Sequence, residues 1–202
     1  ETSYMVMVDA GSSGSRVHVF KLTWPRQRAA GGESREEREK GDGRDARSQT
    51  LPEIELPSKK LKVEPGLSSY EKNPGAAGDS LVKLIEFARR HVPSEKWGET
   101  PFIVAATAGL RLLPTATANA ILDSCEHTLR EKSPFHITKE HIVLLSGVDE
   151  GVYGWLSVNF LAQRLRGMTH AHHGTIGALE MGGASAQVTF SHTPTVTGEG
   201  EG

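Results

Sequence analysis

The chain of 202 residues lacks several features by which a sequence is assigned to a class such as disulfide-rich, membrane-spanning or nucleic-acid-binding proteins. It contains one cysteine, Cys125, which excludes an internal disulfide and says little about the redox compartment. No run of eighteen apolar residues occurs, so no segment is predicted to cross a bilayer as a helix. The formal net charge is only −2, which argues against binding of nucleic acid or a membrane surface through the charge of the whole chain.

Aromatic residues make up 6% of the chain, and the segment 25–50 has none. This segment is rich in charged residues and glycine, and such a composition cannot bury a core. We expect a largely disordered insertion here, with a short charged helix at 33–40 or a nucleic-acid-binding arm as alternatives. The segment 193–202 is predicted to be a flexible tail. Both ends look cut from a longer protein, so the lack of a signal or anchor segment carries no weight.

The most informative stretch is a glycine- and serine-rich turn, 9–16, that lies between two runs of β-type residues, 4–8 and 17–22. Glycines let backbone N–H groups approach a ligand closely, and serine hydroxyls bond to anionic oxygens. Asp9 would repel a bare phosphate, so its presence indicates a divalent cation nearby. We therefore predict a hairpin that binds phosphate and metal, with an ordinary flexible hairpin as the alternative. It is not a Walker loop, because no Gly-Lys-Ser/Thr follows and a strand leaves the turn.

The remaining pattern predicts an α/β fold, a mixed sheet with flanking helices, for which 37% apolar residues suffice. Expected strands are 4–9, 16–24, 53–62, 101–107, 142–145, 175–180 and 186–190, with 110–114 continuing the fourth. Expected helices are 78–92, capped by Asp79 or Ser80, then 115–130 and 148–166. The second helix should pack through Ala116, Ala120, Ile121 and Leu129, and the third through Val152, Trp155, Leu156, Phe160 and Leu161.

Four polar clusters fall at the ends of expected strands: 9–15, 107–111, 146–150 and 180–187. In α/β sheets, ligands bind beyond the carboxyl ends of strands. The stretch 179–185 repeats the order apolar, acid, apolar, glycine, small residue of 8–13, so two similar turns could hold a polyphosphate from opposite sides. Glu150 is the candidate base for an attacking water, which Ser185 and Gln187 could hold; an acid that only complements the helix dipole is the alternative.

These stretches together resemble four of the five conserved regions of the apyrase or CD39 family, the nucleoside triphosphate diphosphohydrolases. The matching stretches are Asp9-Ala10-Gly11-Ser12-Ser13-Gly14-Ser15-Arg16, Thr107-Ala108-Gly109-Leu110-Arg111-Leu112-Leu113, Gly147-Val148-Asp149-Glu150-Gly151-Val152-Tyr153-Gly154-Trp155 and Leu179-Glu180-Met181-Gly182-Gly183-Ala184-Ser185-Ala186-Gln187. The ending of the first region and the single cysteine look most like the Golgi and lysosomal branch.

The resemblance implies an actin/Hsp70/sugar-kinase-like (RNase H-like) fold of two lobes, with residues 1–192 as the amino-terminal lobe and the second lobe absent. It implies hydrolysis of nucleoside tri- or diphosphates to the monophosphate with Ca²⁺ or Mg²⁺, in the endomembrane lumen or at the extracellular face. The implied partner is a nucleotide; nucleic acid is not expected, and any membrane anchor would lie in missing segments.

By motif position, Glu150 is similar to the family's catalytic base, and Ser185 and Gln187 resemble the residues that position water. The resemblance further implies phosphate-binding positions at Ser12, Ser13, Gly14, Ser15, Arg16, Gly182, Gly183 and Ala184. Thr107 and Arg111 match a region that supports the cleft, and Arg111 could contact phosphate or brace a turn. Asp9 and Glu180 match acids that hold the metal through water.

Two departures from the family pattern leave other readings open. Glu180 stands where the family usually has Asp, and its extra methylene could disturb a metal shell. The fifth region is missing, so the chain could be an inactive nucleotide-binding relative, or another phosphotransferase of this fold. The histidines at 170, 172 and 173 are expected in a solvated loop, with a zinc site as the alternative.

Overall fold

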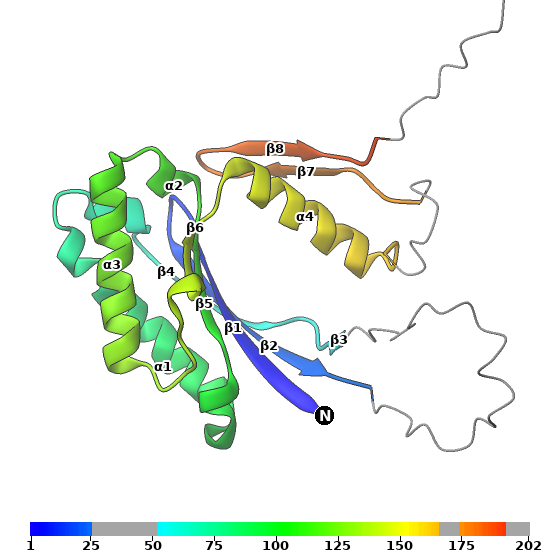
Figure 1. Ribbon diagram of the computed structural model, residues 1–202, viewed down its shortest axis with the longest axis horizontal. Helices are drawn as coiled ribbons and strands as arrows, with labels where there is room; N and C mark the ends of the chain where they lie inside the picture. Colours follow the sequence, from blue (N-terminus) through cyan, green and yellow to red (C-terminus); the bar gives the residue numbers. More distant parts are fainter. Residues whose placement is uncertain (26–51, 166–173, 193–202) are drawn as a thin grey trace, which may run out of the picture.

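The structure is a computed structural model that describes residues 1–25, 52–165 and 174–192 (Figure 1). Its strands are β1 Thr2–Ala10, β2 Ser15–Thr23, β3 Glu53–Ile54, β4 Lys59–Val63, β5 Phe102–Ala106, β6 Ile142–Leu144, β7 Ala178–Met181 and β8 Ala186–Thr189. Its α-helices are α1 Val82–His91, α2 Ala108–Arg111, α3 Thr115–Lys132 and α4 Gly147–Leu161. Short 3-10 helices lie at Leu67–Tyr70, Pro74–Ala76, Gly78–Leu81, Ser94–Glu99 and Lys139–His141.

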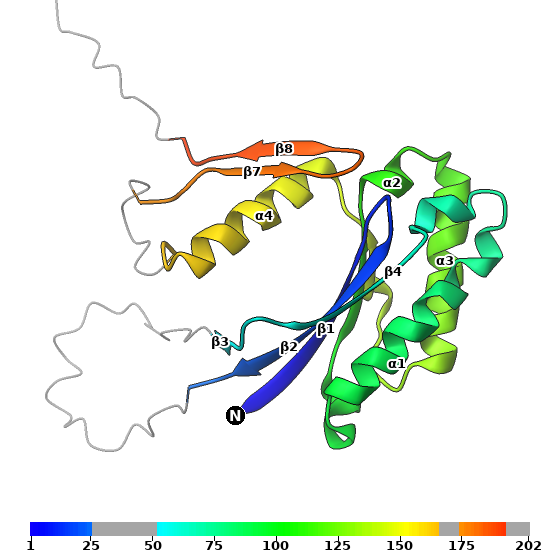
Figure 2. The same cartoon turned by 180° about the vertical axis from the view of Figure 1, so that it is seen from behind.

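Six strands form one mixed sheet in the order β3-β2-β1-β5-β6, with β4 also paired to β2. The β1–β2 hairpin is antiparallel along its whole length, from Thr2 opposite Thr23 to Ala10 opposite Ser15. Strands β5 and β6 run parallel to β1, so the carboxyl ends of β1, β5 and β6 lie at the same edge of the sheet. Figures 1 and 2 show α1 and α3 on one side of this sheet, and α4 with the β7–β8 ribbon on the other.

The core lies between the sheet and the pair α1 and α3. Alternate residues of the strands point into it, as the twofold period of a strand requires, and the helices contribute residues three and four apart. Fully or almost fully buried members include Val6, Val8, Val17, Val19, Leu84, Ile85, Phe102, Val104, Ile121, Cys125 and Leu129. Burial raises the pKa of the Cys125 thiol to about 12, which makes this cysteine unreactive.

Most predicted elements are present, with differences at their ends. The expected strand 53–62 is two short strands, because Pro57 between them has no N–H to donate to a ladder. Residues 108–111 form α2 rather than continuing β5. Helix α1 starts only at Val82, after a 3-10 turn, and neither Asp79 nor Ser80 caps it. The Ser80 hydroxyl instead donates to the carbonyl of Ala77, 2.6 Å away.

The predicted inward faces of two helices were partly wrong. On α3, Ala116 and Ala120 are exposed, and the buried face runs through Ala118, Ile121, Cys125 and Leu129. These residues follow each other at spacings of three and four, whereas Ala116 and Ala120 lie on the neighbouring face. On α4, Val152, Leu156 and Leu161 are exposed, while Gly151 and Asn159 are buried. The expected buried strand 142–145, seen as β6, is only half-buried, with Leu144 exposed.

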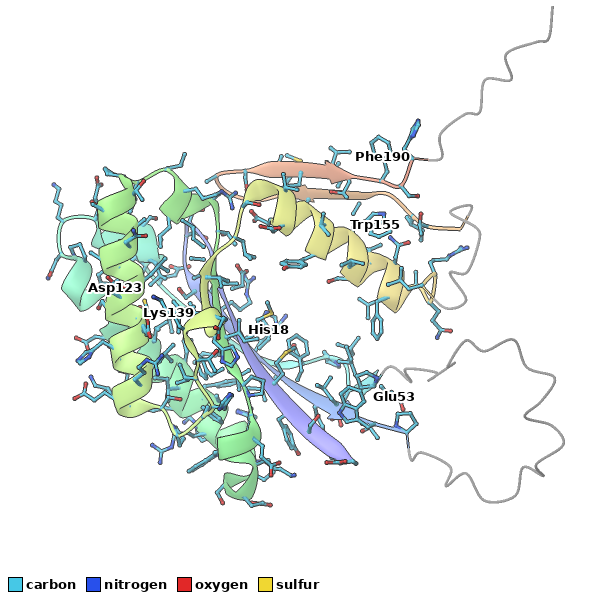
Figure 3. All side chains as sticks on the ribbon, in the orientation of Figure 1. His18, Glu53, Asp123, Lys139, Trp155 and Phe190 are labelled. Atoms are coloured by element: carbon cyan, nitrogen blue, oxygen red, sulfur yellow. The ribbon has the colours of Figure 1, made fainter. Side chains whose placement is uncertain are left out.

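Helix α4 and the β7–β8 ribbon form a two-layer unit with apolar side chains exposed on both outer sides (Figure 3, where the labels Trp155 and Phe190 locate the helix and the end of the ribbon). Large apolar side chains of this unit are exposed, among them Val148, Val152, Tyr153, Leu156, Leu161, Leu179, Met181, Val188 and Phe190. Met181 is 80% and Leu179 70% exposed. In contrast to α1 and α3, α4 packs within the described residues mainly against β7 and β8, so one side of the ribbon and part of the helix face solvent.

Several predictions fall on residues that the structure does not describe. The insertion 25–50 lies almost entirely in the undescribed range 26–51, the three histidines lie in 166–173, and the tail is 193–202. Of the helices in the described ranges, none combines the length and the apolar character that a membrane crossing needs.

Asn159 joins α4 to the chain that enters β7. It is fully buried; its amide nitrogen donates to the carbonyls of Trp155 and Ile176, both 2.9 Å away, and its oxygen accepts from the Ile176 N–H at 2.7 Å. The Asn159 side chain therefore forms hydrogen bonds to both the N–H and the carbonyl of Ile176, a residue that precedes β7 and has no strand partner for these groups.

We predict that Asn159→Ala weakens the α4–β7–β8 unit. Each partly buried backbone group left unpaired costs at most ~1–3 kcal/mol, so amides of residues 174–190 should exchange with deuterium faster than in the wild type. Asn119→Ala, on an exposed position of α3, is the matched control and should change stability by no more than ~0.5 kcal/mol. Equal exchange rates in the two variants would contradict this role of Asn159.

Candidate active site

The four polar clusters predicted from the sequence meet in one cavity of about 160 Å³. It lies where the carboxyl ends of β1 and β5 face the first turn of α4 and the turn of the β7–β8 ribbon. The lining residues are Asp9, Gly11, Ser12, Ser13, Gly14, Arg16, Lys62, Thr107, Ala108, Glu150, Glu180, Gly182, Gly183, Ala184 and Ser185. Asp9 and Ser185, more than 170 residues apart in sequence, therefore share a cavity, as a site of this kind requires.

The two glycine turns have the same backbone closure and touch each other. The N–H of Gly11 donates to the carbonyl of Gly14 at 3.1 Å, and the N–H of Gly182 donates to the carbonyl of Ser185 at 2.8 Å. A methyl group added at Gly183 would lie 2.7 Å from the hydroxyl oxygen of Ser12, too close for a real contact. The absence of a side chain at Gly183 thus allows the two turns to form opposite walls of the cavity.

Ser12 is also enclosed from behind by two further glycines. A methyl group at Gly109 would lie 2.9 Å from the Cα atom of Ser12, and one at Gly66 would lie 2.5 Å from its carbonyl oxygen. These glycines belong to α2 and to the turn after β4. The turn 11–14 is therefore held between three separate segments, which fixes the directions of its N–H groups.

Glu150 lies in the first turn of α4, which Ser146 caps by accepting the Asp149 N–H at 3.0 Å. The Oε2 atom of Glu150 lies 2.9 Å from Nη1 of Arg111 and accepts from the amide of Gln187 at 3.3 Å. The same Gln187 amide donates to the Ser185 hydroxyl oxygen at 3.0 Å. Glu150, Gln187 and Ser185 are thus linked along one wall, and the Glu150 side chain is only 13% exposed.

Acidic groups repel one another across the cavity. Burial raises the pKa of Asp9, and the negative charge of Glu150 raises it further. The nearby Arg16 and His18 act in the opposite direction; Arg16 lies 3.7 Å from the Asp9 carboxylate. Burial also raises the pKa of Glu180, as do the charges of Glu150 and Asp9. These carboxylates are therefore close enough to interact, and a bound cation would relieve their repulsion.

The donor set suits a cation only in part. Within the described ranges, no group of three or more His, Cys or acidic side chains is arranged to hold a metal by itself. Asp9 and Glu180 both line the cavity, and hard cations such as Ca²⁺ and Mg²⁺ accept water and phosphate oxygens as ligands. The residues present thus fit a cation that takes most of its ligands from water and a bound phosphate.

Three of the predicted site residues do not line the cavity, and one charged lining residue, Lys62, was not predicted. Ser15 is fully buried and does not line the cavity, because it is the first residue of β2 and its side chain points into the core. Gln187 and Arg111 are not lining residues either and reach the site through Glu150. Lys62 lines the cavity opposite Arg16 in the β2–β4 pairing, a register that no sequence pattern gives.

Comparison with known proteins gives consistent matches. The model of the GDA1/CD39 (nucleoside phosphatase) family matches residues 1–200. The chain is 40% identical over 191 residues to "Probable apyrase 2" of Oryza sativa subsp. japonica, 36% over 189 residues to "Nucleoside diphosphate phosphatase ENTPD5" of Homo sapiens, and 36% over 194 residues to "Golgi apyrase" of Saccharomyces cerevisiae. The alignments cover 92–94% of this chain but only 29–38% of those proteins, so the chain spans about a third of their length.

A solved nucleoside triphosphate hydrolase from Neospora caninum superposes with a TM-score of 0.56 at 18% identity, covering 96% of this chain and 40% of that one. At this identity the likeness concerns the fold alone. It confirms the predicted class, an α/β lobe with a mixed sheet and flanking helices.

We predict that Glu180→Gln stabilises the metal-free protein near neutral pH. A carboxyl whose pKa is raised in the folded state binds its proton more tightly there, so its contribution to stability is present at low pH and is lost as the pH rises through the folded pKa. Removing the charge should raise the thermal midpoint at about pH 7 and leave it unchanged at about pH 4. Glu71→Gln, at an exposed position outside the cavity, is the control; an equal gain in both variants would argue against repulsion at the site.

Proposed function

Because the chain belongs to the GDA1/CD39 (nucleoside phosphatase) family, we propose that its cavity takes part in hydrolysis of nucleoside di- and triphosphates to the monophosphate and phosphate. The observation that carries the proposal is the linked set Glu150, Gln187 and Ser185, of which Glu150 and Ser185 line the same cavity as the two glycine turns. An acid, a water-holding hydroxyl and a phosphate cradle are the parts that in-line attack of water on phosphorus needs. The relatives named as apyrases and as a nucleoside diphosphate phosphatase support this substrate class.

The phosphates bind to the two turns. Backbone N–H groups of 12–14 and 183–185, with the hydroxyls of Ser12 and Ser13, would donate to the phosphate oxygens from both walls, because the N–H groups of Gly11 and Gly182 close the two turns. Arg16 and Lys62 add positive charge at the β2–β4 side of the cavity. Charge-assisted bonds of this kind are stronger than neutral ones, so these two cations should determine much of the affinity.

A divalent cation, Ca²⁺ or Mg²⁺, would be held through water by Asp9 and Glu180. When bound, it supplies positive charge that neutralises the phosphate oxygens and withdraws electrons from phosphorus. Glu180 is longer than the aspartate expected from the family resemblance, and the structure accommodates its Oε2 beside Gly154, where an added methyl group would lie 3.2 Å away.

Glu150 takes the proton of the attacking water. The Gln187 amide donates to both Glu150 and Ser185, so the Ser185 hydroxyl is left with its own proton to donate to that water or to a phosphate oxygen. Thr107 lines the same cavity at the end of β5 and supports the wall between the first turn and α4.

We further propose that the protein acts in the lumen of the endomembrane system, since a relative is named for the Golgi. The expectation that residues 1–192 form the amino-terminal one of two lobes, and that any membrane anchor lies outside this chain, stays a prediction.

Glu150→Gln should lower kcat by about 10²–10⁴-fold, because the amide cannot accept the proton, and should leave nucleotide affinity within about threefold. The measurement is phosphate release from a panel of nucleotides in Ca²⁺ or Mg²⁺, together with titration of a non-hydrolysable nucleotide. Asp149→Asn is the matched control, since this neighbouring acid accepts from Ser146 at 2.7 Å and does not line the cavity. Undiminished kcat in Glu150→Gln would refute the base; a wild type that binds nucleotide without releasing phosphate would favour an inactive relative.

Lys62→Ala should raise KM by about tenfold, the size of one charge-assisted hydrogen bond, with little change in kcat. Lys60→Ala is the control: it removes the same charge from the same face of β4, two residues away, at a position outside the cavity. If the two substitutions have equal effects, the nucleotide is attracted by the overall charge of β4 and not by a direct contact with Lys62.

A further inference from the structure

The guanidinium of Arg111 faces the Glu150 carboxylate from the adjoining segment α2. Its Nη1 atom donates to the carbonyl of Leu145 at 2.7 Å and lies 2.9 Å from Oε2 of Glu150. The Arg111 side chain is 23% exposed, so this ion pair is largely removed from water. Arg111 is not among the residues that line the cavity.

We propose that Arg111 is a positioning residue that orients Glu150 for proton transfer and does not bind phosphate; this rests on the proposed hydrolase function. The sequence left open whether Arg111 contacts phosphate or braces a turn. Because one guanidinium nitrogen serves Leu145 and Glu150 together, the arginine ties the end of β6 to the first turn of α4. A second nitrogen, Nη2, lies over Gly147, the first residue of that helix, where an added methyl group would be 4.0 Å away.

The contacts select one oxygen of the carboxylate. Arg111 and the Gln187 amide both engage Oε2 of Glu150, at 2.9 and 3.3 Å. Oε1 is thereby left as the oxygen that takes the proton, on a side chain that would otherwise sample several rotamers. A catalytic group displaced by about 1 Å can lose about 10²-fold in rate, so the orientation that Arg111 imposes should appear in kcat.

The test compares Arg111→Ala and Arg111→Lys with the wild type in the full-length protein. Arg111→Ala should lower kcat about 100-fold and leave both KM and the affinity for a non-hydrolysable nucleotide within about threefold. Arg111→Lys should recover part of the rate, since a lysine offers a charge but no planar fork. Added guanidinium ion at millimolar concentration should raise kcat of Arg111→Ala and leave Arg111→Lys unchanged. Arg130→Ala, which removes an exposed arginine paired with Glu126, is the control.

The possible outcomes distinguish three roles of Arg111: positioning Glu150, binding phosphate, or only stabilising the fold. A tenfold or larger loss of nucleotide affinity with kcat retained would assign Arg111 to phosphate and overturn the proposal, as would unchanged kinetics. Loss of rate without rescue by guanidinium, together with a lower unfolding midpoint, would make the arginine merely structural and likewise overturn it. If the wild type releases no phosphate, the proposed function fails and the inference falls with it; if the wild type is active and Arg111→Ala keeps its kcat, only the inference fails.

Discussion

The candidate site depends on one steric condition, the absence of side chains around Ser12. Gly66, Gly109 and Gly183 approach this residue from three directions, and a methyl group on any of them would lie within 3 Å of it. Only this close packing lets the β1–β2 turn and the β7–β8 turn face each other across a cavity small enough for a phosphate group. The directions of the backbone donors are therefore set by packing before any ligand binds, as electrostatic preorganisation requires.

Charge is arranged around this frame so that each acid has a different environment. Arg111 pairs with Glu150, and Arg16 lies beside Asp9, whereas no ion pair with Glu180 is found among the described residues. Glu180 is also the acid whose raised pKa follows from burial and from the charges of the other two acids. A cavity that brings acids from both walls together with Arg16, Lys62 and backbone N–H groups has mixed charge, which suits a cation and a phosphate bound together.

Much of this arrangement can be read from the sequence, because it is local. The alternation of apolar residues gives β1 and β2, and the glycine–serine stretches give both turns and place their acids. What the sequence could not give depends on register and helix rotation. Lys62 lines the site because it lies opposite Arg16 in the β2–β4 pairing. Ser15 does not line the site, because it is the first residue of β2 and is buried. The buried face of α3 contains Ala118 and Cys125 in place of the predicted Ala116 and Ala120. The link from Arg111 to Glu150 joins segments 39 residues apart in sequence and has no local signature.

The apolar side chains exposed on both outer sides of the α4–β7–β8 unit have a consequence for the stability of one cavity wall. Glu150, Ser185 and Gln187, the groups assigned to the attacking water, all belong to this unit, whereas most of the buried core lies behind the opposite wall. Val152 and Leu156 are exposed on the outer side of α4, and Met181 and Val188 on the outer side of the ribbon, so this wall is supported by less buried apolar surface than the opposite wall. The two walls of the cavity therefore differ in local stability: opening of the α4–β7–β8 unit should cost less free energy than opening of the sheet.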